Sequence, residues 1–182
     1  MTTYIVLFRG VGGATLLPVK PLKDALIEGG FDKVATYINT GNVVLVSELQ
    51  RQTILQRVAS IALENFAFSK AIMILDRQEW SSLIAGNPFP QHAAEGNKLH
   101  AFILEKEPET EAVQALERKA VGLPEQFTIL GKVLYYYAPQ GASQSKLHGE
   151  IESTLKVAAT ARNWNTVLKL GDLAERLEGE TQ

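Results

Sequence analysis

Hydrophobic positions along the first half of the chain alternate or repeat at helical spacing, which predicts a strand-helix-strand-strand-helix-strand order. The first strand, residues 4–9, is apolar on both faces, as in a strand buried in the middle of a sheet. Two further strands form a hairpin around Thr40 and Gly41, a short turn signal. Predicted strands cover residues 4–9, 34–39, 42–46 and 71–75, and predicted helices begin at Pro21, at Ser47 in a capping box with Gln50, and at Asp76 with Glu79.

The same succession of patterns returns in the second half of the chain. Residues 87–97 hold two prolines and a glycine that interrupt any regular period, so we expect a connection between two modules there. A helix that ends before Gly122 follows the first strand of this half, and a hairpin turns at Gly131. Predicted strands cover residues 99–105, 126–130, 133–138 and 158–162, and predicted helices cover residues 108–120, residues 145–156 and the segment after Trp164.

The repeated order predicts the fold class. A strand-helix-strand-strand-helix-strand unit is the ferredoxin-like arrangement, in which helices cover one face of an antiparallel sheet. We therefore expect an α+β fold of two tandem ferredoxin-like (βαββαβ) modules plus a C-terminal helix. Residues 1–86 form the first module, residues 87–97 the connection, and residues 98–182 the second module with the C-terminal helix. The face of the sheet without helices should also be covered, by the other module, by the final helix or by a second subunit.

Composition excludes several classes of chemistry. The chain has 182 residues, of which 46% are hydrophobic and 21% charged, as in a soluble globular protein. No apolar run is long enough for a membrane span or a signal peptide, so the cytoplasm is the expected location. The absence of cysteine excludes disulfides and thiolate nucleophiles. His92, His100 and His148 share no short ligand spacing with acidic residues, so we expect no metal or cofactor and treat all three as structural or exposed.

The charge balance argues against nucleic acid as a partner. Formal net charge is -2, with 8 basic and 8 acidic residues up to Asn97 and 10 basic and 12 acidic residues after it. Phosphate neutralisation dominates nucleic-acid affinity, so only a local basic patch would leave that partner open. Tyr135, Tyr136 and Tyr137 are similar to the stacking residues of RNA-binding sheets, but tyrosine is common in strands. The sequence predicts no membrane partner and does not define the oligomeric state.

The segment 160–170 is the best candidate for a site, because a dense polar group runs directly into an amphipathic helix. Arg162 carries a permanent planar charge with forked donors, and Trp164 offers a large face with one donor. Asn163 and Asn165 can each donate and accept hydrogen bonds. Together these side chains could hold an anion, a planar ligand or another part of the chain. The structural alternative is that Asn163, Asn165 or Thr166 caps the helix, Trp164 is buried and Arg162 pairs with a carboxylate.

Two weaker candidates lie elsewhere in the chain. Arg9 precedes a glycine-rich turn, residues 10–13, whose backbone amides could form an anion-binding concavity, although the turn is not a recognised phosphate loop. Ser143 and Lys146 have the spacing of the serine and lysine in some acyl-transfer enzymes, but Ser145 is better explained as a helix cap. Lys146 at a helix start opposes the helix dipole, a cost that an anionic partner would remove.

Three segments carry a resemblance to a known family. Residues 9–13, 37–44 and 160–170 resemble the three signatures of an uncharacterised, mostly bacterial family, domain of unknown function 1697, and residues 145–147 resemble a further signature. The resemblance spans nearly the whole chain and implies a cytoplasmic α+β protein of ferredoxin-like halves with no established activity. The family usually has two more residues and several lysines in the first loop, where this chain has Ala14-Thr15-Leu16, so the resemblance shifts an anion-binding role toward Arg162 and Lys146.

Three functional hypotheses follow from these observations. The first is a cytoplasmic binding protein for a small anionic or nucleotide-like ligand, held by Arg162, Asn163, Trp164 and Asn165 with Lys146 and Arg9. A second is a metal-independent enzyme that uses Lys146 or a carboxylate, for which Lys146 should be buried beside a serine. The third is a structural or interaction protein without a small-molecule ligand, which burial of Trp164 together with internal pairing of Arg162 would favour.

Overall fold

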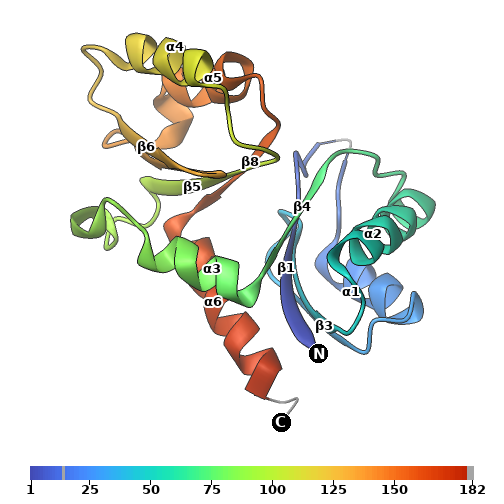
Figure 1. The fold of residues 1–182 in the computed structure, drawn as a ribbon. Helices are drawn as coiled ribbons and strands as arrows, with labels where there is room; N and C mark the ends of the chain where they lie inside the picture. The colour runs from blue at the N-terminus through green and yellow to red at the C-terminus, as the bar shows by residue number, and fades with distance from the viewer. Residues whose placement is uncertain (14, 180–182) are drawn as a thin grey trace. The chain divides into compact units, whose positions relative to one another are not determined.

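The chain folds as an α+β protein with two four-stranded antiparallel sheets (Figure 1). The computed structural model describes residues 1–13 and 15–179. Within these residues it has six α-helices, the last of them at the C-terminal end. These residues form two compact units, of which the first comprises residues up to Ser82 together with residues 169–179, and the second comprises residues 83–168.

The first unit has the strand-helix-strand-strand-helix-strand order that the sequence predicts. Its sheet has the strand order β2-β3-β1-β4, and each neighbouring pair is antiparallel. Ile5 of β1 lies opposite Val44 of β3 and Leu75 of β4. The elements are β1 (Thr2–Phe8), α1 (Val19–Glu28), β2 (Lys33–Thr36), β3 (Asn42–Ser47), α2 (Arg51–Phe66) and β4 (Ile72–Asp76).

Both faces of β1 are buried, as its hydrophobic pattern predicts. Val6 belongs to a core with Leu22 of α1 and Ile54 of α2, so these two helices cover one face of the sheet (Figure 1). Ile5 and Leu7 alternate with the residues of that core, and both are 0% exposed. The prediction of a central strand with two buried apolar faces is therefore confirmed.

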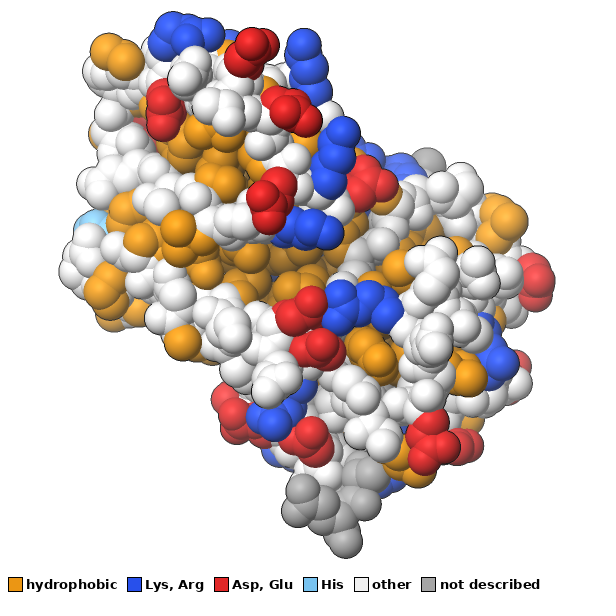
Figure 2. Space-filling view, in the orientation of Figure 1, with side chains coloured by type: hydrophobic (Ala, Val, Ile, Leu, Met, Phe, Trp, Pro, Cys, Tyr) orange, Lys and Arg blue, Asp and Glu red, His pale blue; other side chains and the backbone are white. Residues whose placement is uncertain are grey.

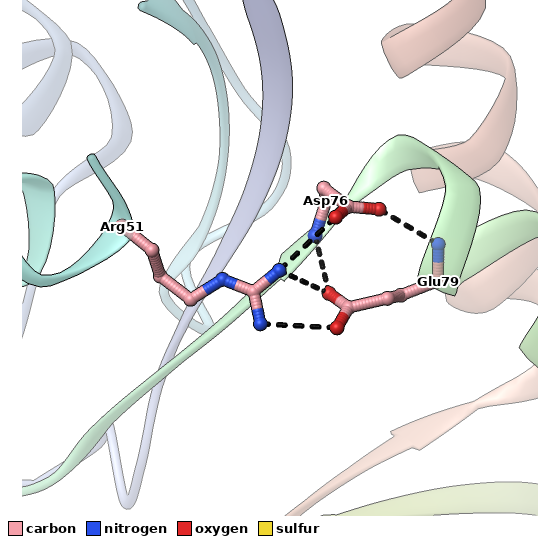
Figure 3. A network of polar contacts seen from close by, with 3 residues as sticks. All are labelled: Arg51, Asp76 and Glu79. Carbon is pink, nitrogen blue, oxygen red and sulfur yellow. Dashed lines mark hydrogen bonds and ion pairs between the residues drawn. The ribbon is translucent and has the colours of Figure 1, made fainter. Parts of the chain in front are cut away.

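The start of α3 (Arg77–Ala85) is fixed by the pair of acidic residues that the sequence predicts there (Figure 3). Asp76 Oδ1 accepts a hydrogen bond from Glu79 N, and Glu79 Oε2 accepts one from Asp76 N, each at 2.8 Å. Arg51, the first residue of α2, donates to both carboxylates at 2.6–3.1 Å. The hydrogen bond to Glu79 raises the pKa of Arg51, and the arginine joins the start of α2 to the start of α3.

The predicted capping box at the start of α2 is wrong. Ser47 Oγ accepts a hydrogen bond from Leu49 N at 3.1 Å, so the serine closes a local turn at the end of β3. Gln50 occupies the cap position of α2 but makes no side-chain capping bond. Ser47 and Gln50 therefore have the spacing of a capping box, but the serine makes a different local hydrogen bond.

The second unit repeats the element order and the strand pairing of the first. Its sheet has the order β6-β7-β5-β8, again antiparallel throughout. Phe102 of β5 lies opposite Leu134 of β7 and Ala161 of β8, and Leu116 and Ile151 contribute to the same core from two helices. The elements are β5 (Leu99–Leu104), α4 (Thr110–Ala120), β6 (Gln126–Leu130), β7 (Val133–Tyr137), α5 (Lys146–Leu155) and β8 (Ala159–Asn163), with short 3-10 helices at Pro90–His92 and Ala142–Gln144. The last helix, α6 (Trp164–Gly179), begins in this unit, and from Lys169 its residues belong to the first unit.

Candidate functional site

Arg162 of the C-terminal signature is buried in β8. Its exposed fraction is 8%, and Nη1 donates to Thr160 Oγ1 at 2.7 Å and to the carbonyl oxygen of Ala161 at 2.8 Å. Burial lowers the pKa of the guanidinium to about 10, so it remains charged at neutral pH. The Nη1 donors of Arg162 therefore serve the strand itself, and little of the side chain is exposed.

The three residues after Arg162 begin the final helix. Asn163 Oδ1 accepts a hydrogen bond from Thr166 N at 2.9 Å, which makes Asn163 the cap of α6. Trp164 is 2% exposed, and its backbone N donates to the carbonyl oxygen of Gly96 at 2.9 Å. Asn165 is exposed on the helix surface beside Gly96. Two parts of the structural alternative are therefore confirmed, namely that Asn163 caps this helix and that Trp164 is buried. The pairing of Arg162 with a carboxylate stays a prediction.

Lys146 lies on the other side of the second sheet from Arg162. Leu147 of α5 belongs to the core cluster against which Ala161 packs, so α5 covers the face of the sheet to which Ala161 points. Side chains alternate along a strand, so Arg162 points to the opposite face. Lys146 itself is exposed at the first position of α5. The structure thus keeps these two candidate residues apart, and the burial of Lys146 that the enzyme hypothesis needs is not observed.

Ser145 has the structural role that the sequence predicts. Its Oγ accepts a hydrogen bond from His148 N at 3.2 Å and so caps α5. The same oxygen lies 2.5 Å from the hydroxyl oxygen of Tyr136 on β7. The cap is therefore tied to the sheet below it, which fixes where Lys146 begins the helix.

Two of the histidines come together in the second unit. The rings of His100 on β5 and His148 on α5 lie 5.9 Å apart, and both rings are largely enclosed by neighbouring side chains. Burial lowers the pKa of His100 to about 4 and also lowers that of His148. Both rings are therefore neutral at neutral pH. Within residues 1–13 and 15–179, no group of three His, Asp or Glu side chains is placed to hold a metal ion.

The glycine-rich turn after β1 is a compact, hydrogen-bonded loop. Gly10, Gly12 and Gly13 have φ angles of 64°, 146° and 56°. Residues with a Cβ rarely adopt such angles. Gly12 and Thr15 exchange two backbone hydrogen bonds of 3.1 and 3.0 Å. Arg9 is half-buried at the start of this turn, where its backbone N donates to the carbonyl oxygen of Ala71 at 3.1 Å.

Lys70 supplies a positive charge to this turn from outside it, and sequence reasoning missed it. Its ammonium donates to the carbonyl oxygen of Gly10 at 2.8 Å and to Thr15 Oγ1 at 3.1 Å. Both acceptors are uncharged, and in the part of the chain that the structure describes Lys70 takes part in no ion pair. The strand pairing could have indicated Lys70, because β4 runs antiparallel beside β1 and the start of β4 therefore lies next to the end of β1.

The hairpin between β2 and β3 is joined to the same turn. Gly41 accepts a backbone hydrogen bond from Phe8 N at 2.9 Å at the end of β1. Asn39 Oδ1 accepts one from Val19 N at 3.3 Å and so caps α1 from a distant loop. The second signature segment thus holds the end of β1 and the start of α1 in place around the glycine-rich turn.

Ile38 in this hairpin is strained. Its φ angle is 45°, a left-handed conformation that is costly for a β-branched side chain, and the side chain is 46% exposed. We expect Ile38→Asn to raise the free energy of unfolding by about 1 kcal/mol, because asparagine tolerates this conformation. Urea denaturation measures the change as a shift of the midpoint.

Ile27→Asn is the matched control for Ile38→Asn. Ile27 is 43% exposed, but it lies in the helix α1, where there is no left-handed strain to relieve. This substitution should lower the free energy of unfolding slightly, since asparagine is a poorer helix former than isoleucine. A loss of stability in Ile38→Asn as large as that in Ile27→Asn would show that Ile38 is not under strain.

The fold and these contacts define a two-unit α+β protein whose signature segments mainly support its own structure. The chain belongs to the family described as "Protein of unknown function (DUF1697)", whose model matches residues 1–135. The family resemblance is therefore confirmed. The C-terminal signature, residues 160–170, lies beyond the matched residues.

A solved structure from Streptococcus pneumoniae, described as that of the conserved bacterial protein SP0830, is similar in fold. The two chains share 21% sequence identity with a TM-score of 0.66, over 96% of this chain and 99% of the other. At this identity the likeness shows the fold alone. No curated protein matches the chain. Among the described residues, no helix is both long and apolar enough to span a membrane.

Proposed function

We propose that this chain is a cytoplasmic binding protein for a small anionic ligand, built from two ferredoxin-like modules, and that the anion binds beside Lys70. The observation that carries the proposal is the Lys70 ammonium, which is held at the glycine-rich turn by two uncharged acceptors. An ammonium has three N–H donors, so one remains for a ligand. A cation without a carboxylate partner attracts an anion without first having to break an ion pair.

The absence of a side chain at Gly10 lets the Lys70 ammonium come close to the turn. A Cβ on Gly10 would lie 3.2 Å from Lys70 Nζ, so the glycine leaves the space that the lysine occupies. Backbone amides of glycine-rich turns are donors in many anion sites. Lys70 is exposed, so water and salt screen its charge and a small anion alone should bind weakly.

The proposal predicts a phosphate response that depends on Lys70. With inorganic phosphate in excess and the ionic strength held constant with chloride, the melting temperature of the wild type should rise. A ligand at a hundred times its dissociation constant adds about 2.7 kcal/mol, or roughly 5–10 °C for a chain of this size. Lys70→Met should abolish the rise, because it removes the cation and keeps most of the side-chain volume. Differential scanning calorimetry checks both results.

Lys23→Met is the matched control for this experiment. Lys23 is exposed on α1, so the substitution changes the net charge by the same amount without touching the turn. A phosphate response that persists in Lys70→Met, or that Lys23→Met abolishes equally, would contradict the proposed site. If Arg162→Ala removes the response while Lys70→Met does not, the anion binds at the C-terminal signature instead.

A structural or interaction protein is the second candidate function. The specific observation in its favour is that Trp164 is 2% exposed while Arg162 donates to its own strand. The C-terminal signature then secures the end of β8 and the start of α6. Absence of any phosphate response in the wild type would favour this candidate over the anion-binding protein.

A further inference from the structure

A hollow lies next to Lys70 in the first unit. Its volume is about 280 Å³, and apolar atoms make up most of its surface. One wall is a turn of α2 and the other is the segment that leads into β4. The lining residues are Ala59, Ser60 and Leu63 from α2, and Phe68, Ser69, Lys70 and Ile72 from the segment after it.

The hollow is a consequence of how α2 ends. Ala67 has a φ angle of 52°, and its N–H bonds back to the carbonyl oxygen of Leu63 at 3.0 Å, so the chain reverses sharply after the helix. Phe68 is then turned inward, where it is 2% exposed and packs edge-on against Phe8 with ring centroids 5.3 Å apart. The hollow therefore has a fixed aromatic wall, while Leu63 is 55% exposed beside it.

One side chain links the apolar wall to a positive charge, because Lys70 lines the hollow and its ammonium lies at the glycine-rich turn. The end of α2 carries partial negative charge on its last carbonyl groups, so an anionic group is disfavoured over the helix end. The anionic group of a ligand should accordingly lie on the side of the glycine-rich turn. Its apolar part would then lie between Leu63 and Phe68.

We propose that the ligand of this site is amphipathic: an aryl or short-chain alkyl phosphate or carboxylate, with its anionic group beside Lys70 and its apolar part in the hollow. An apolar cavity of about 150 Å³ is large enough to admit benzene, so a hollow of 280 Å³ accepts one aromatic ring or a short chain. It lies just below the roughly 300–1,000 Å³ of pockets for larger ligands. This inference rests on the proposed anion-binding function and specifies its ligand.

Phenyl phosphate and inorganic phosphate are the probes that test the inference. Isothermal titration of the full chain should give an affinity for phenyl phosphate about tenfold higher than that for phosphate, because the ring buries apolar surface. Leu63→Ser should remove at least half of this advantage and leave phosphate binding unchanged. Lys70→Met should weaken the binding of both probes. Leu123→Ser, at a leucine that is 43% exposed in the other unit, should alter neither affinity.

The outcomes separate this inference from the proposed function. If the two probes bind equally through Lys70, or if Leu63→Ser has no effect on phenyl phosphate, the amphipathic ligand is excluded and the anion site stands. If Lys70→Met does not weaken the binding of phenyl phosphate, this probe binds through apolar contacts only, and the inference is overturned. If neither probe binds in a way that depends on Lys70, both the inference and the proposed anion site fail.

Discussion

Gly41→Ala is expected to destabilise the first unit by about 3 kcal/mol, through strain and crowding together. Gly41 has a φ angle of 72°, which costs a residue with a Cβ roughly 1–2 kcal/mol. The added Cβ would also lie 2.6 Å from Phe8 Cβ and 2.7 Å from Val11 Cγ2. Phe8 is 0% exposed in the central strand β1, so it has little room to move. Urea denaturation followed by circular dichroism measures the loss.

Gly13→Ala separates the two causes of this loss. Gly13 has a φ angle of 56° in the same unit, but no atom lies within 4 Å of a Cβ built there. This variant should therefore lose only the roughly 1–2 kcal/mol of backbone strain. Equal losses in Gly41→Ala and Gly13→Ala would show that contact with Phe8 and Val11 plays no part, and that the hairpin is not packed against the glycine-rich turn.

The order of strands and helices was predictable because each element buries a face whose spacing shows in the sequence. β6, Gln126–Leu130, has the predicted bounds, and β1 is apolar on both sides because both sides are buried. The second strand was predicted too long, over 34–39, whereas β2 ends at Thr36. Ile38 favours strands in general, and nothing in its identity indicates the left-handed conformation that the closed hairpin imposes on it.

The candidate site was harder to predict, because the roles of polar residues depend on which face of an element they occupy. Arg162 follows Ala161 in β8, and the small alanine side chain turns toward the helices while the long arginine points to the other face. Arg162 and Asn163 of this polar cluster thus make hydrogen bonds within the chain itself. Lys70 and Gly10 are 60 residues apart, and only the antiparallel pairing of β4 with β1 brings them together.

The sequence did not indicate that His100 and His148 lie close together, because this contact also depends on the tertiary structure. The two residues lie on β5 and α5, and their contact depends on where the capped start of α5 rests on the sheet. The ring of His148 packs against those of Phe102 and Tyr136, and the ring of His100 packs against that of His148. Their burial nevertheless has a consequence for the stability of the second unit in acid.

Acidification from pH 7 to pH 4.5 is expected to lower the free energy of unfolding by about 2 kcal/mol through His100 alone. Burial, and to a lesser degree the neighbouring His148, lowers the pKa of His100 to about 4 in the folded chain, against 6.5 for an exposed histidine. The unfolded chain therefore binds the proton more readily between these values. Stability from this group is complete above pH 6.5 and is lost as the pH falls toward 4.

His100→Phe should flatten this dependence, as measured by urea denaturation at intervals between pH 7 and pH 4.5. The quantity compared is the slope of the free energy of unfolding against pH. A packing cost of the larger ring that is the same at every pH does not change this slope. Measurements stop at pH 4.5 because Glu95 titrates below it: hydrogen bonds from Lys98, Tyr137 and His92 lower its pKa to about 2. Stability from Glu95 is present above its ordinary pKa of 4.5 and is lost toward pH 2.

Phe102→Leu provides the control for packing beside the histidines. Phe102 is 4% exposed, and its ring centroid lies 5.1 Å from that of His148. The variant should lower stability by about 1 kcal/mol at every pH while it keeps the wild-type slope, since it removes packing but no titratable group. If His100→Phe retains the wild-type slope between pH 7 and pH 4.5, the imidazole of His100 is protonated without loss of the fold, and burial of its neutral form is not what makes the second unit sensitive to acid.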